Sequence, residues 1–94
     1  MIDAAGATAI AALVLRQRAI FAGTIETVAS FERPWVRTDA VLNDGTGTLM
    51  LRFLGRASVP GFTTRRQVVA EGTPGLVRGA LVMINPLYSF TGDG

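Results

Sequence analysis

The chain has 94 residues, of which 49% are hydrophobic and 17% are charged, and these values predict one compact domain rather than a disordered segment. It contains no cysteine and no histidine, which excludes disulfides, thiolate nucleophiles, Cys/His zinc sites and imidazole acid–base catalysis. All nine basic residues are arginine and seven residues are acidic, so the net charge of +2 only weakly indicates an anionic partner, and codon bias toward arginine would leave the same composition.

The first predicted element is a short helix over residues 3–15. Asp3 can cap its start, and Ile10, Leu13 and Val14 recur at helical spacing. The apolar stripe of such a helix would cover part of the core or dock on a neighbouring subunit.

We expect neither a membrane span nor a secretion signal. The longest apolar run, residues 9–15, is far shorter than the ~20 residues that a membrane-spanning helix requires. A secretory signal would place positive charge before this run, where the chain has Asp3. The expected protein is cytoplasmic and has no membrane partner.

Beyond residue 17 the composition is typical of β-structure. Residues 18–30 predict a long first strand, and Gly23 predicts a sharp bend in it or the close approach of another backbone. Residues 30–35 predict a loop, because Pro34 lacks the N–H that a strand interior requires.

A hairpin follows this loop. Residues 35–42 and 48–55 alternate apolar and polar side chains, and residues 43–47 supply the Asn, Asp and Gly of a tight turn. The alternation places Arg37 and Arg52 together on the outward face. The inward face carries Val36, Thr38, Ala40, Leu42, Leu49, Leu51 and Phe53.

The C-terminal half predicts two more strands and an edge segment. Residues 55–66 form the longest connection, and strands over residues 67–72 and 80–84 flank a turn-rich loop, residues 73–79. Residues 87–90 can resume pairing at a sheet edge.

Five antiparallel strands with a long, bent first strand fit the oligonucleotide/oligosaccharide-binding (OB) fold, a five-stranded Greek-key barrel. We therefore expect an all-β chain with an N-terminal helical extension over residues 1–15 and an OB-fold barrel over residues 16–94. The binding face of such a barrel lies on strands two and three, with the loops after strands one and four at its rim.

The turn residues also resemble a known family. The segments GATAIAAL, GTIETV, LNDGTGTLMLRFLGR, VPGF, VVAEG and LVMINPLY, within residues 6–88, are similar to small actinobacterial proteins described as nucleic-acid-binding OB-fold proteins. The pattern DGTG, LG, PG, EG, NP consists mostly of turn residues. It is therefore fairly specific for the barrel but carries almost no information about the ligand. The resemblance implies an OB fold and nucleic-acid binding.

Binding of single-stranded nucleic acid by such a barrel requires cations along the backbone path and aromatic rings on which bases stack. The candidate nucleic-acid-binding residues are Arg33, Trp35, Arg37, Arg52, Arg56, Arg65, Arg66, Arg78 and Tyr88. Trp35, in a loop between arginines, is a candidate stacking platform, or alternatively a barrel-end plug or a subunit contact. Arg37 and Arg52 can also be read as cross-strand partners of Asp39 or Glu26.

The sequence contains no pattern that indicates catalysis. Asp44 fits the chemistry of an Asp-Gly turn. The segment GTGTLM lacks the third glycine and following helix of a dinucleotide loop, and a Walker loop would require a lysine. We expect a non-catalytic protein without a metal or cofactor.

Our first interpretation is a protein that binds single-stranded or distorted DNA or RNA on the strand two/three face, with an affinity that falls as salt rises. The alternative is a protein–protein interaction or homo-oligomeric assembly module that uses the same face. Outward apolar residues favour the alternative. They are Val41, Met50, Ile84 and Leu87.

Overall fold

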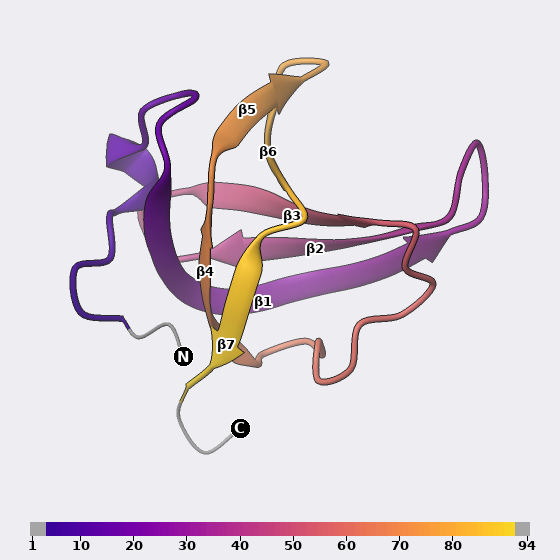
Figure 1. Ribbon diagram of the computed structural model, residues 1–94. Coiled ribbons are helices and arrows are strands. Elements are labelled where there is room, and N and C mark those ends of the chain that lie inside the picture. The colour runs from indigo at the N-terminus through magenta and orange to yellow at the C-terminus, as the bar shows by residue number, and fades with distance from the viewer. Residues whose placement is uncertain (1–3, 92–94) are drawn as a thin grey trace.

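The computed structural model describes residues 4–91 and is mainly β (Figure 1). Within these residues seven strands form one mixed sheet, in the order β5-β6-β3-β2-β1-β4-β7. The strands are β1 (Ala19–Phe31), β2 (Arg37–Asn43), β3 (Thr48–Leu54), β4 (Gln67–Gly72), β5 (Pro74–Val77), β6 (Ala80–Ile84) and β7 (Leu87–Phe90). Neighbouring strands are antiparallel except β3 and β6, which run parallel.

The predicted closed, five-stranded barrel is wrong in strand number and in closure. Hydrogen-bonded pairing ends at β5 on one side of the sheet and at β7 on the other, so the sheet is not closed. The predicted loop over residues 73–79 contains β5, which pairs with β6. Pro74 indicated a loop, but proline is tolerated as the first residue of an edge strand, where its missing N–H removes no ladder bond.

The predicted N-terminal helix is also wrong. Within the described residues the only helical element is one 3-10 turn, η1 (Ile10–Ala12), and the proposed cap Asp3 lies outside them. The backbone N–H groups of Ile10 and Ala11 donate to the side chains of Asp44 and Thr46, more than thirty residues away in sequence. These donors are therefore not available for the hydrogen bonds of an α-helix. In the described part of the chain, no helix has the length and hydropathy needed to span a membrane.

Strand β1 is long because it pairs with two neighbours in succession. Its first half pairs with β4 and its second half with β2, and Thr24 has a partner in both. A β-bulge between Ile25 and Thr27 accompanies the change of partner. Gly23 lies just before this point, where an added Cβ would be 2.5 Å from the carbonyl oxygen of Asn43. The predicted close approach of another backbone at Gly23 is confirmed.

The core lies on one face of the sheet, and the predicted alternation is confirmed within β2 and β3. Val36, also expected on the inward face, is 38% exposed because it lies in the loop before β2 begins at Arg37. Thr38, Ala40 and Leu42 of β2 are buried, as are Leu49, Leu51 and Phe53 of β3. The cluster of buried side chains that forms the core also includes Ile10 from the N-terminal turn. This segment therefore contributes to the core although it is not an α-helix. Other buried members are Phe21, Ile25, Val59, Phe62, Val68, Ala70 and Met83.

The turn between β2 and β3 fastens the N-terminal segment to the sheet. The Asp44 carboxylate accepts hydrogen bonds from the Thr46 hydroxyl and from the backbone N–H groups of Thr46, Gly47 and Ile10, the last at 2.7 Å. Partial burial acts to raise the pKa of Asp44, but these hydrogen bonds lower it below the ordinary value of 3.8. The expected turn role of Asp44 is confirmed, and the same side chain positions η1.

Replacing Gly23 with alanine is expected to lower the free energy of unfolding by about 1–3 kcal/mol, because the new methyl group would collide with backbone atoms that cannot rotate away. Gly75 is the matched control, since a Cβ there has no neighbour within 4 Å and its backbone is not left-handed. Urea denaturation of Gly23→Ala and Gly75→Ala measures both changes. Equal stability of the two variants would contradict the close contact at Gly23.

Replacing Asp44 with asparagine is expected to cost about 1–2 kcal/mol at neutral pH, because charge-assisted hydrogen bonds to a partly exposed carboxylate are lost. The folded-state pKa is lower than the unfolded value, so this stabilisation is present above pH 3.8 and is lost as the pH falls through the folded pKa. Urea denaturation should therefore give a difference at pH 7 that shrinks below pH 3.8 and disappears once the pH lies below the folded-state pKa. Glu32→Gln, at an exposed carboxylate, should change little at either pH.

Candidate functional site

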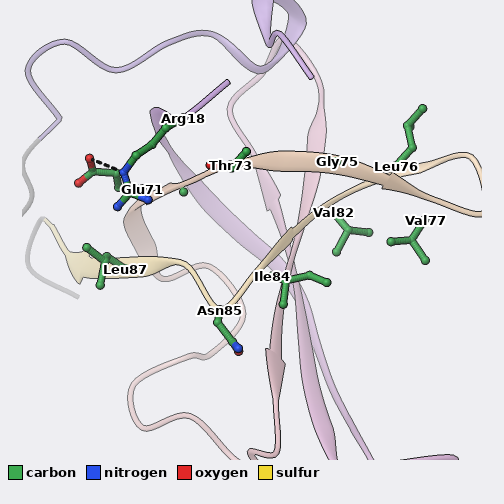
Figure 2. Close-up of a pocket in the computed structure, with 11 residues that line it drawn as sticks. Arg18, Glu71, Thr73, Gly75, Leu76, Val77, Val82, Ile84, Asn85 and Leu87 are labelled. Carbon is green, nitrogen blue, oxygen red and sulfur yellow. Dashed lines mark hydrogen bonds and ion pairs between the residues drawn. The ribbon is translucent and has the colours of Figure 1, made fainter. Parts of the chain in front are cut away.

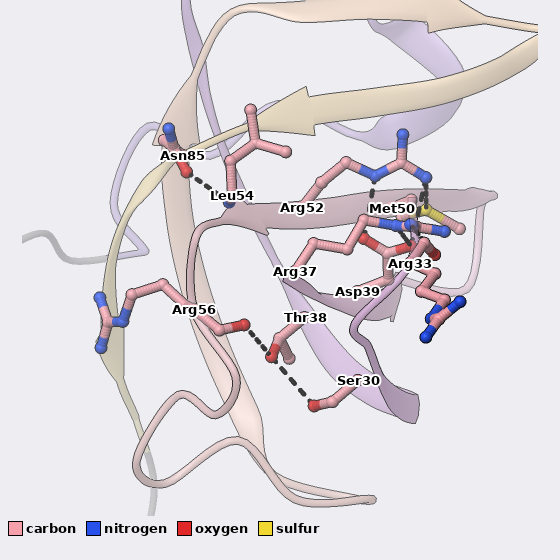
Figure 3. Close-up of polar contacts among 10 residues, drawn as sticks. All are labelled: Ser30, Arg33, Arg37, Thr38, Asp39, Met50, Arg52, Leu54, Arg56 and Asn85. Carbon is pink, nitrogen blue, oxygen red and sulfur yellow. Dashed lines mark hydrogen bonds and ion pairs between the residues drawn. The ribbon is translucent and has the colours of Figure 1, made fainter. Parts of the chain in front are cut away.

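Two arginines and one aspartate meet on the outward face of the β2–β3 hairpin (Figure 3). Asp39 and Arg52 are direct cross-strand partners, and Arg37 lies two residues before Asp39. Arg52 donates from Nε (2.9 Å) and Nη2 (3.2 Å) to the carboxylate, and Arg37 donates from Nε (3.3 Å). The predicted shared face of Arg37 and Arg52 is confirmed. We call these three residues the arginine triad.

The triad is largely enclosed. The side chains of Arg37 and Arg52 are 16% exposed and that of Asp39 is 8% exposed. The Arg37 guanidinium lies 4.3 Å from the centre of the Phe31 ring. Among the described contacts, Nη1 of Arg52 and Nη2 of Arg37 have no hydrogen-bond partner. These two nitrogens remain available as hydrogen-bond donors.

A groove of about 290 Å³ runs over this face. Its floor consists of Arg37, Met50 and Arg52, and the loop between β1 and β2 contributes Pro34 and Trp35 on one side. The β5–β6 hairpin forms the other side. It contributes Val77, Arg78, Ala80 and Val82. We call this feature the strand groove, and it brings together four of the nine predicted residues, namely Trp35, Arg37, Arg52 and Arg78.

Arg78 reaches the groove because of the tight turn in which it lies. Arg78 and Gly79 form the two-residue connection between β5 and β6, and both have positive φ, 51° and 82°. Two successive left-handed residues define the turn type that matches the twist of a hairpin. The turn therefore holds a charged side chain at the rim.

Next to the strand groove lies an apolar hollow of about 540 Å³. The two share Trp35, Arg52 and Val77. The hollow is otherwise lined by Val36, Leu54, Gly55 and Ile84. Trp35 lines both features and is 54% exposed, so much of its surface is open to solvent.

Arg33 and Arg56 border the triad without joining it. The carbonyl oxygen of Arg33 accepts a long hydrogen bond (3.5 Å) from Arg37 Nη1, and Arg33 lines a separate hollow beside Phe31. The Thr38 hydroxyl donates to the carbonyl oxygen of Arg56 at 2.8 Å, which fixes the backbone of Arg56. Figure 3 shows the side chain of Arg56 extending away from the triad.

The other three predicted residues lie elsewhere. Arg65 is exposed in the connection before β4, and its N–H donates to the carbonyl oxygen of Ile25. Arg66 lies over the Phe90 ring at 4.2 Å. Tyr88 packs edge-on against Phe53 and Phe62, with ring centres 5.5 and 4.9 Å apart, so it belongs to an aromatic cluster.

The apolar wall of the groove was not predicted. Val77 lies in the stretch expected to be a loop, and Val82 was expected only as part of a strand. The sequence did contain a signal, since Arg78-Gly79 between Leu76-Val77 and Ala80-Leu81 is a two-residue hairpin turn flanked by apolar residues.

Among residues 4–91, no group of three or more Asp, Glu, His or Cys side chains could hold a metal ion. A search of family models finds no match to the chain, and a search of curated proteins finds no significant match either. The groove therefore has to be interpreted from its own chemistry.

Replacing Asp39 with asparagine is expected to lower the free energy of unfolding by about 2–4 kcal/mol, because two enclosed guanidinium groups lose their counter-charge. Glu71→Gln is the control, since its pair with Arg18 is much more exposed and should contribute less than about 1 kcal/mol. Thermal or urea unfolding gives both values. A cost at Asp39 no larger than at Glu71 would show that water screens the triad.

Proposed function

We propose that the protein is a non-catalytic nucleic-acid-binding protein that holds a single strand in the strand groove. One observation carries the proposal: an exposed tryptophan ring and three guanidinium groups from three separate segments line the same groove. Arginine donors match phosphate oxygens and base carbonyls, and an aromatic ring stacks on any base.

The shape of the groove favours an unpaired strand over a duplex. Its sides carry Pro34, Trp35, Val77 and Val82, which suit the flat faces of exposed bases. In a duplex these faces are covered by neighbouring base pairs. A duplex would present only its phosphates and groove edges to this surface.

The order of the strands supports a partly open OB arrangement. Only Thr73 separates β4 from β5, and only Asn85 and Pro86 separate β6 from β7. If β4 and β5 are counted as one long bent strand, and β6 and β7 as another, the sheet has five strands. The first then pairs with the second and the fourth, and the third runs parallel to the fifth. In an OB fold the ligand lies over strands two and three, between the loops after strands one and four. Those loops correspond here to residues 32–36, which hold Trp35, and to the turn at Arg78.

The charge in the groove sets the expected strength of binding. Three arginines and the Asp39 carboxylate leave two net positive charges there. For a single strand, the logarithm of the association constant should fall with the logarithm of salt concentration with a slope of about −1.4. Binding is expected to be weak and sensitive to salt.

Trp35 is the only tryptophan in the sequence, so its fluorescence reports the groove directly. Titration with a single-stranded oligonucleotide at low salt should quench this fluorescence and raise the anisotropy of a labelled strand in parallel. Trp35→Ala should weaken binding about 5- to 150-fold, the usual cost of one lost stacking contact.

Arg78→Asn and Arg65→Asn form a matched pair, because both remove one positive charge from an exposed residue with positive φ, which asparagine tolerates. Arg78→Asn should weaken binding about tenfold and Arg65→Asn less than about twofold. Equal losses would point to non-specific attraction. No change in fluorescence or anisotropy at tens of micromolar protein would refute the proposed function.

A further inference from the structure

The polar side chains that line the strand groove are almost exclusively hydrogen-bond donors. Among the described residues they are Trp35, Arg37, Arg52 and Arg78. An indole N–H and a guanidinium group donate and do not accept. The one side-chain acceptor in this lining is the sulfur of Met50, which is weak and already receives Nη2 of Arg52 at 3.6 Å. The lining therefore suits a part of the ligand that carries acceptors.

The three arginines of the groove differ in how many of their donors are already used. Arg52 donates to Asp39 through Nε and Nη2, and Arg37 donates through Nε. Arg78 is exposed, and its guanidinium makes no hydrogen bond or ion pair within the described part of the chain. Arg78 can therefore offer two parallel N–H donors to one planar partner, which a lysine could not.

The two sides of the groove fit the faces of a single flat base. Trp35 lines one side, and Val77 and Val82 line the other. Figure 2 shows these two valines beside each other, in agreement with the register of β5 and β6, which puts them on the same face of the hairpin. The volume of about 290 Å³ lies at the lower end of the range for small-ligand pockets. The groove is therefore suited to one base rather than to a row of stacked bases.

We propose that the strand groove selects guanine within a single strand, and that Arg78 recognises the O6 and N7 atoms of this base. The inference rests on the proposed function and names the base that the groove recognises. Guanine presents O6 and N7 as neighbouring acceptors, and their pairing with arginine is the commonest base-specific contact. At the same edge adenine has an amino donor in place of O6, and thymine has one carbonyl.

Cytosine is the closest competitor, because its O2 and N3 atoms are also neighbouring acceptors. Its single ring covers less of the apolar sides of the groove than the double ring of guanine does. The combination of an acceptor pair with a large flat face therefore favours guanine.

Thymidine-rich oligonucleotides that differ at one central base test the inference by competition with a labelled strand. A central guanine should bind at least about fivefold more tightly than adenine, cytosine or thymine, the lower bound for one bidentate pair. Hypoxanthine, which keeps O6 and N7, should bind as guanine does, whereas 7-deazaguanine, which lacks N7, should lose the preference. Because O6 and N7 carry no formal charge, the preference should persist when added salt weakens the binding of every strand.

Arg78→Lys keeps the positive charge but removes the planar pair of donors, so it should reduce the guanine preference to less than about twofold. Arg65→Lys is the matched control, since Arg65 is also exposed and has positive φ but does not line the groove, and it should leave the preference intact. Circular dichroism checks that both variants are folded.

The outcomes separate this inference from the proposed function. Binding that is equally tight for every central base, or a guanine preference that survives Arg78→Lys or the loss of N7, would overturn the inference and leave the proposed function in place. Absence of binding by every strand would refute both.

Discussion

The fold depends on the way in which β1 changes partner along its length. Its first half pairs with β4 and its second half with β2, with Thr24 paired to both. One strand can serve two neighbours in this way only if the sheet bends sharply, and the absence of a side chain at Gly23 lets the backbone of Asn43 approach. The bend turns the β2–β3 hairpin over the core and leaves its opposite face open, which is where the arginine triad and the strand groove lie.

The triad shows how a small sheet can hold two cations close together. Without Asp39, the charges of Arg37 and Arg52 would repel each other in a partly dehydrated setting. The carboxylate removes one unit of charge and fixes both side chains through their Nε atoms. The hydrogen-bond donors of the groove are therefore held in fixed positions, and the net positive charge that attracts polyanions is reduced. This exchange is consistent with a ligand recognised by fit and stacking as well as by charge.

The parts of the fold that the sequence predicted are those that depend on local patterns. Alternation alone placed Arg37 and Arg52 on the same face, and the Asn-Asp-Gly turn fixed the register between β2 and β3. The N-terminal helix failed because alanine-rich spacing reports only local preference, whereas Ile10 and Ala11 bond to Asp44 and Thr46 from a distant turn. Tertiary hydrogen bonds of this kind leave no periodic trace in a sequence.

The same limit applies to the strand groove, of which only the part that depends on local pattern was predicted. Its floor could be predicted from the alternation of side chains along β2 and β3. Its apolar wall was missed because Pro74 and Gly75 indicate a loop and outweighed the hairpin signal of Arg78-Gly79, although β5 pairs with β6. The predicted residues Arg65, Arg66 and Tyr88 were assigned by sequence neighbourhood, and the fold carries them to a different surface.

The arginines with positive φ have a consequence for protein engineering. Three of the four non-glycine residues with positive φ in the described chain are Arg16, Arg65 and Arg78. Such a backbone costs an ordinary residue about 1–2 kcal/mol, and glycine escapes most of that strain. A screen for thermal stability alone would thus favour glycine at position 78 and remove the positive charge from the rim of the strand groove. Selection for stability therefore favours glycine at position 78, whereas retention of the charged rim requires arginine there.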